Sequence, residues 1–180
     1  MPGDWFVVRV TSGWIGGGVV CPGVVSWGRE VRVVGEGVTR FRPGDEVFGD
    51  NLELKGGFGE YAIAAEGSLT HKPADLTFAP ASTIPQAGAI ALQGTGQAAV
   101  GRRVLINGGG RGSGSFAIQL AKRLGAHVTG VDNASKLDFM RSLGADEVID
   151  YQRHDFTRPG ERYDLILDLA SWTRDTGNLL

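Results

Sequence analysis

The order of hydrophobic and polar positions divides the chain into two parts. Up to about residue 98 the apolar positions come in short runs, many of them β-branched, separated by turns rich in glycine and proline. Such runs predict short strands, which we expect at 6–10, 30–34, 45–48 and 61–64. A polar connection follows over 66–78. The alanine-rich stretch 79–98 predicts helix after Pro80, interrupted at Pro85 and Gly88.

From Arg102 onward the rhythm changes to strand, helix, strand. Apolar runs predict strands at 103–107, 127–131, 146–149 and 163–168, and amphipathic segments predict helices at 113–124 and 134–142. Asn133 is a candidate N-cap for the second helix. Strands that alternate with helices indicate a parallel, doubly wound sheet. We therefore expect an α/β protein with a small β domain at 1–98 and half of a dinucleotide-binding fold at 99–180.

A glycine-rich loop connects the strand at 103–107 to the helix that follows. Its residues are Gly109, Gly110, Arg111, Gly112, Ser113 and Gly114. They read as G-x-G-x-x-G with Arg111 in place of the second glycine. A strand, glycine turn and helix direct helix N-terminal N–H groups at the pyrophosphate of a dinucleotide, so this loop predicts cofactor binding. A glycine turn without a ligand is the alternative. The Arg111 side chain either fills the pyrophosphate space or swings outward and pairs with a phosphate.

An acidic residue follows the loop at the spacing expected for cofactor selection. Asp132 ends the second of these strands, 18 residues beyond Gly114. A carboxylate at this position accepts hydrogen bonds from the adenosine ribose and repels a 2′-phosphate, which favours NADH over NADPH. The alternative is a solvated turn aspartate. Lys136 is a further candidate cofactor residue that would soften this selectivity, unless it only belongs to a polar helix face.

Charge and hydropathy limit the classes of binding partner that we expect. A net charge of −2 over 180 residues gives no indication of binding to nucleic acid or anionic lipid. No apolar run approaches the roughly 20 residues of a membrane span, and the N-terminus has no signal-peptide pattern. We expect no nucleic-acid or membrane partner and a cytoplasmic location.

Cysteine and histidine are sparse. Cys21 is the only cysteine, and His71, His127 and His154 stand far apart in the sequence. Zinc sites need closely spaced cysteine or histidine ligands, so we expect no metal site. No serine, cysteine or histidine stands in a catalytic motif, and the catalytic residues remain unassigned.

Six segments spread over most of the chain carry a family resemblance. They are Val38–Gly49, Gly57–Ala62, Lys72–Thr77, Ala91–Gly94, Leu137–Tyr151 and Tyr163–Asp168. They resemble the zinc-independent, quinone oxidoreductase-like branch of the medium-chain dehydrogenase/reductase superfamily. The resemblance implies a partial GroES-like catalytic domain followed by a partial Rossmann domain, in a chain truncated at both ends. It also implies an enzyme that transfers a hydride from NAD(P)H to a quinone, enone or related conjugated carbonyl without zinc.

Some positions depart from the family pattern. The family loop reads G-A-S-G-G-V-G, so Arg111 replaces a glycine and Ser113 a valine, while Leu169 replaces the asparagine of D-N-V-G. These positions lie near the cofactor in the family. Three functions stay open: a working reductase, an impaired paralogue that acts as a nucleotide- or protein-binding module, and a fragment completed by another polypeptide. An exposed sheet edge invites pairing with another chain, and a homodimer is the expected assembly.

Overall fold

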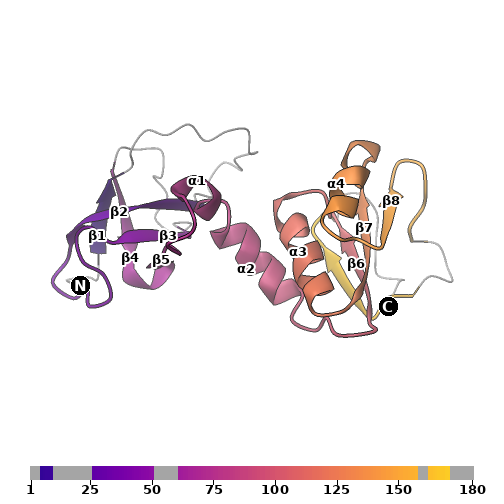
Figure 1. Ribbon diagram of the computed structural model, residues 1–180, viewed down its shortest axis with the longest axis horizontal. Helices are drawn as coiled ribbons and strands as arrows, with labels where there is room; N and C mark the ends of the chain where they lie inside the picture. Colours follow the sequence, from indigo (N-terminus) through magenta and orange to yellow (C-terminus); the bar gives the residue numbers. More distant parts are fainter. Residues whose placement is uncertain (1–4, 10–25, 51–60, 158–161, 171–180) are drawn as a thin grey trace. The chain divides into compact units, whose positions relative to one another are not determined.

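The computed structural model describes residues 5–9, 26–50, 61–157 and 162–170. The chain forms two compact units, Met1–Gln86 and Ala87–Leu180 (Figure 1). The segments 10–25, 51–60 and 171–180 lie outside the described residues, and so do Cys21 and most of the Gly57–Ala62 motif.

The first unit is built on an antiparallel sheet. In the part of the chain that the structure describes, its strands follow the order β4-β1-β2-β3-β5. They are β1 (Trp5–Arg9), β2 (Ser26–Val34), β3 (Glu46–Asp50), β4 (Tyr61–Ala65) and β5 (Leu69–His71). A 3₁₀ turn at Glu66–Ser68 and the short helix α1 (Phe78–Ala81) complete the described elements. The core of this unit consists of Val31, Phe41, Val47, Ala64 and Leu69.

The four strands predicted in this unit are confirmed, but one further strand was missed. The stretch 66–78 was expected to be a polar connection, whereas Leu69–His71 pairs with β3 as β5. Only Leu69 of the three is buried, so a run this short shows no apolar alternation in the sequence. Pairing with a strand far away in the sequence decides its conformation.

The second unit contains a parallel sheet with the order β8-β7-β6-β9 among its described residues. The strands are β6 (Arg103–Asn107), β7 (His127–Asp132), β8 (Glu147–Asp150) and β9 (Leu165–Asp168). The helices are α2 (Pro85–Gly94), α3 (Gly112–Arg123) and α4 (Leu137–Ser142), the last preceded by a 3₁₀ turn at Ala134–Lys136. The predicted parallel, doubly wound sheet is confirmed. Asn133 caps the 3₁₀ turn by accepting a hydrogen bond from the Ser135 N–H.

Both faces of this sheet are covered. Val104 and Ile106 of β6 belong to the core that also holds Ile118 of α3 and Met140 of α4. Leu105, which points the other way, packs in a second cluster with residues that include Phe156 and Tyr163. Burial on both faces explains why these strands read as continuous apolar runs.

The boundary between the units falls at the start of α2, earlier than the expected boundary after residue 98. Helix α2 packs with the second unit: Ala91 is fully buried in its core. A Cβ on Gly94 would come within 3.0 Å of the Leu167 Cδ2 on β9. The alanine-rich stretch 79–98 contains two helices rather than one. α1 ends at Ala81, and Pro85 begins α2. Within the described ranges, no helix has the length and hydropathy needed to span a bilayer.

Candidate functional site

Each strand of the parallel sheet ends in a polar residue. Asn107 ends β6, Asp132 ends β7, Asp150 ends β8 and Asp168 ends β9. Asn107 pairs with Asp168, and Asp132 with Asp150, so the four lie in one row along the carboxyl edge. This edge is where open α/β sheets bind ligands, at the point where the strand order reverses. Here that point lies between β6 and β9.

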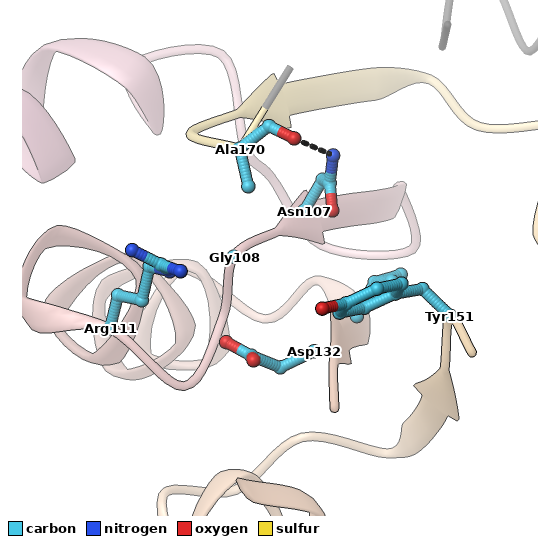
Figure 2. A pocket seen from close by; sticks show the side chains of 7 residues that line it. Asn107, Gly108, Arg111, Asp132, Tyr151 and Ala170 are labelled. Atoms are coloured by element: carbon cyan, nitrogen blue, oxygen red, sulfur yellow. Dashed lines mark hydrogen bonds between the residues drawn. The ribbon is translucent and has the colours of Figure 1, made fainter. Parts of the chain in front are cut away.

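A small pocket opens at this edge (Figure 2). The empty space within it, open solvent included, is about 200 Å3. It is lined by Asn107, Gly108, Arg111, Val131, Asp132, Tyr151 and Ala170. The lining comes from the ends of β6 and β7, the loop before α3, and the residues that follow β8 and β9. Arg111 and Asp132, two of the predicted site residues, thus share one pocket.

The glycine loop makes a tight turn directly after β6. Gly108 has φ of +85°, a conformation that side chains rarely adopt. The N–H groups of Gly108 and Gly109 both donate to the Val131 carbonyl oxygen, at 2.9 and 3.0 Å. A Cβ on Gly114 would overlap the Gly108 carbonyl oxygen and lie 2.7 Å from the Gly109 Cα. The loop therefore folds back on the first turn of α3, and the absence of a side chain at Gly114 permits this contact.

Asp132 holds the loop from the neighbouring strand. Its Oδ2 accepts a hydrogen bond from the Gly110 N–H at 3.1 Å, and its Oδ1 accepts one from the Asn133 N–H at 2.8 Å. The residue is only 5% exposed, which excludes the alternative of a solvated turn aspartate. Each carboxylate oxygen keeps a further lone pair for a ligand hydroxyl. Lys136 is exposed, and its stem covers Gly110, where an added Cβ would lie 2.6 Å from the Lys136 Cβ.

The N-terminus of α3 has the features of an anion site. The first N–H groups of a helix have no partner within the helix. Among the described residues no side-chain hydrogen bond caps α3, and no acidic residue stands in its first turn. Gly112 is exposed, and a Cβ there would meet only the Ala87 Cβ, at 3.8 Å. Ser113 is partly buried in the same turn. This turn can therefore receive the negative charge of a phosphate.

Arg111 occupies the N-cap position of α3. Its φ of −104° and ψ of 175° are extended backbone that any residue adopts, so the arginine causes no strain where the family has glycine. The residue is exposed and lines the pocket, as Asp132 does from the other side of the loop (Figure 2).

Several pocket residues were not predicted as site residues. The Asn107 Nδ2 donates to the Asp168 Oδ1 at 2.9 Å and to the Ala170 carbonyl oxygen at 3.2 Å. Tyr151 follows β8, and its N–H donates to the Asp132 carbonyl oxygen at 3.2 Å. A polar residue stands at the end of each predicted strand or directly after it, and this signal could have identified Asn107.

Within the described ranges, no three side chains of histidine, cysteine, aspartate or glutamate gather as a metal site would require. His71 stacks at a tilt on Phe41 with ring centroids 4.9 Å apart. His127 lies 3.9 Å from Glu147 on the neighbouring strand, and both side chains are exposed. Neither contact resembles a metal centre.

The chain is similar to a set of quinone oxidoreductases. Residues 112–173 match the family model described as zinc-binding dehydrogenase. A chloroplast envelope quinone oxidoreductase homolog from Arabidopsis thaliana is 36% identical over 158 residues, which cover 79% of this chain and 47% of that protein. The solved quinone oxidoreductase from Coxiella burnetii is 32% identical with a TM-score of 0.75, covering 81% of this chain and 48% of that one. The chain belongs to the quinone oxidoreductase-like branch of the medium-chain dehydrogenase/reductase superfamily.

Membership in this branch confirms the predicted fold class, a GroES-like β part followed by a Rossmann part. The Escherichia coli quinone oxidoreductase, solved in complex with NADPH, is 26% identical with a TM-score of 0.68 and covers 74% of this chain and 42% of that one. The chain spans about half the length of the curated relatives that it matches.

Proposed function

We propose that this chain binds NAD(P)H and belongs to an oxidoreductase that transfers a hydride to a quinone or related conjugated carbonyl without zinc. One observation carries the proposal: the uncapped N-terminus of α3 and the turn at Gly108 open into the same pocket as the buried Asp132. The names of the relatives support the reaction class, and the E. coli neighbour was solved with NADPH. The wide sequence spacing of the histidines supports chemistry without zinc.

The pocket residues fit the parts of a dinucleotide. The pyrophosphate would lie against the first turn of α3, where free N–H groups meet it. The adenosine half would lie over the ends of β7 and β8, beside Asp132 and Tyr151. The nicotinamide half would then lie on the other side of the switch point, over the ends of β6 and β9. The bound cofactor supplies the hydride, and these residues bind and orient it.

Arg111 pairs with the pyrophosphate in this proposal rather than filling its space. The residue is exposed at the helix N-cap and lines the pocket, and its backbone is unstrained, so a phosphate at the first turn of α3 would lie beside its guanidinium without a change in the loop. Loss of a charged hydrogen bond weakens binding by about tenfold or more, which is the expected effect of Arg111→Ala on NADH affinity. Arg102→Ala removes the same charge at the amino end of β6 and is the matched control. Tighter binding by Arg111→Ala would mean instead that the side chain obstructs the site.

We propose NADH as the preferred cofactor. The carboxylate of Asp132 is buried and fixed by two N–H groups, so it cannot turn away from a 2′-phosphate placed beside it. Lys136 works in the opposite direction because this exposed, positively charged residue lies beside Gly110. Asp132→Asn removes the charge and keeps the shape, and it should lower the ratio of NADH to NADPH affinity. A ratio that does not change would refute the role of the charge.

The function is tested by titrating the chain with NADH and NADPH, followed by nicotinamide fluorescence or calorimetry. A series of quinones is then added, and the loss of nicotinamide absorbance is recorded. Binding together with turnover supports an oxidoreductase. Binding without turnover would favour the alternative of a nucleotide-binding module. Absence of binding at millimolar concentrations of both cofactors would contradict the proposal.

Assembly and location remain predictions. β9 is an edge strand of the described sheet, and unpaired strand edges recruit further strands, which supports a homodimer. Light scattering coupled to gel filtration measures this directly. The Arabidopsis relative is named as a chloroplast envelope protein. Fractionation of the native source tests the predicted cytoplasmic location.

A further inference from the structure

The ends of β6 and β9 are joined by one buried side chain. Asn107 is fully buried, and its side-chain amide donates to the Asp168 Oδ1 at 2.9 Å. The same amide donates to the Ala170 carbonyl oxygen at 3.2 Å (Figure 2). The Asn107 carbonyl oxygen accepts the Leu169 N–H at 3.0 Å. The Asp168 Oδ1 accepts a second hydrogen bond, from the Ala170 N–H, at 3.1 Å. Residues 168–170 are therefore held to β6 by both main chain and side chain.

The same segment touches the glycine turn. A Cβ on Gly108 would lie 3.2 Å from the Ala170 Cβ and 3.4 Å from the Leu169 Cβ. Ala170 is 2% exposed and lines the pocket. The turn at Gly108 and the segment after β9 therefore pack closely, and a shift of one disturbs the other.

We propose that Asn107 is a positioning residue that fixes residues 168–170 as the wall of the nicotinamide half of the site. This inference rests on the proposed function, since it assumes that a dinucleotide crosses the switch point between β6 and β9. Asp132 lies on the β7 side of β6, so the adenosine half is directed away from β9. The segment held by Asn107 is then in reach of the nicotinamide half alone.

A purely structural role for Asn107 predicts something different. Loss of the amide leaves the Ala170 carbonyl oxygen without this donor, which destabilises the unit whatever ligand is bound. A general loss of structure would weaken all nucleotides alike. The positioning role weakens only ligands that extend past the pyrophosphate. ADP, which lacks the nicotinamide half, separates the two roles.

The experiment is calorimetric titration of the Asn107→Ala chain with NADH and with ADP. We expect NADH affinity to fall by about tenfold while ADP affinity stays within about twofold of the unmodified chain. Val104→Ala is the matched control: it also truncates a fully buried side chain of β6, but at the other end of the strand, and should leave the ratio of the two affinities unchanged. Asp168→Asn keeps an oxygen acceptor for the Asn107 amide and should retain most of the NADH affinity.

Equal weakening of NADH and ADP, or no change in either, would overturn the positioning role while leaving cofactor binding intact. A selective loss that Val104→Ala reproduces would overturn it as well. If the unmodified chain binds neither NADH nor ADP, the proposed function fails and the inference fails with it.

Discussion

Substitution of glycine by alanine is expected to have opposite effects on stability at two positions in the first turn of α3. Gly114→Ala places a methyl group against the Gly108 carbonyl oxygen and within 2.9 Å of the Gly108 carbonyl carbon. These are backbone atoms, so relief requires a shift of the loop or the helix. Gly112→Ala places its methyl group in open space, with only the Ala87 Cβ at 3.8 Å.

The magnitudes follow from these contacts. Insertion of a methyl group into a packed site costs about 1–3 kcal/mol, and here no flexible side chain can give way. Alanine returns at most about 1 kcal/mol through its higher helix propensity. The overlap with backbone atoms puts the cost at the upper end of this range, so Gly114→Ala should lower the free energy of unfolding by about 2 kcal/mol. Gly112→Ala gains the propensity without the clash and should leave stability unchanged or raise it by up to about 1 kcal/mol.

Urea unfolding without ligand measures both variants. Far-ultraviolet circular dichroism reports mainly helix, and α3, α4 and most of α2 belong to the second unit. The signal therefore follows the part of the chain that carries the substitutions. Equal midpoints for Gly114→Ala and Gly112→Ala would refute the close approach of loop and helix. A fall for Gly112→Ala alone would contradict the whole assignment of the turn.

Two further substitutions test the interior and the surface of the second unit. Thr129 is fully buried, and among the described residues its hydroxyl has no hydrogen-bond partner. Thr129→Val should therefore raise the free energy of unfolding, measured with urea, by about 1 kcal/mol, and a decrease of that size would show that the hydroxyl is satisfied. Burial raises the pKa of Asp146, but the hydrogen bonds from Lys122 and the Val128 N–H outweigh it and hold the pKa below its ordinary value. The contribution of Asp146 to stability is then complete above about pH 4 and is lost as pH falls further. In Asp146→Asn the urea midpoint should therefore fall less steeply with pH on the acid side than in the unmodified chain. An unchanged fall would contradict the pairing of Asp146 with Lys122.

The sequence predicted best what depends on neighbouring residues. The strands of the parallel sheet are apolar throughout because both faces are buried, and their ends are marked by glycine or by polar residues. β5 was missed and the start of β2 was placed four residues late, because both depend on pairing with β3: Ser26 lies opposite Asp50, and Leu69 lies opposite Gly49. Such pairs join residues distant in sequence, and a short polar run has no pattern that announces them.

The site shows the same division. Spacing placed Asp132 at the end of the second strand of the parallel sheet, but it could not show that both carboxylate oxygens would hold backbone N–H groups, since that depends on how the Gly110 turn closes. In the sequence Tyr151 stands out only as part of a family motif, whereas in the structure it lines the pocket. The row of polar strand ends was visible in the sequence, and it becomes informative only once the strands are known to be parallel.

Arg111 shows why a motif has to be judged position by position. The glycine pattern combines two requirements, one from the fold and one from the ligand. The fold requires glycine where φ is positive or where a Cβ would meet backbone or a packed stem, as at Gly108, Gly110 and Gly114. At Arg111 the backbone is extended, so only the approach of a phosphate can require a small residue there. The arginine at position 111 therefore leaves the fold intact, and its effect must appear in cofactor affinity. The difference in NADH affinity between Arg111→Ala and Arg102→Ala measures this effect directly.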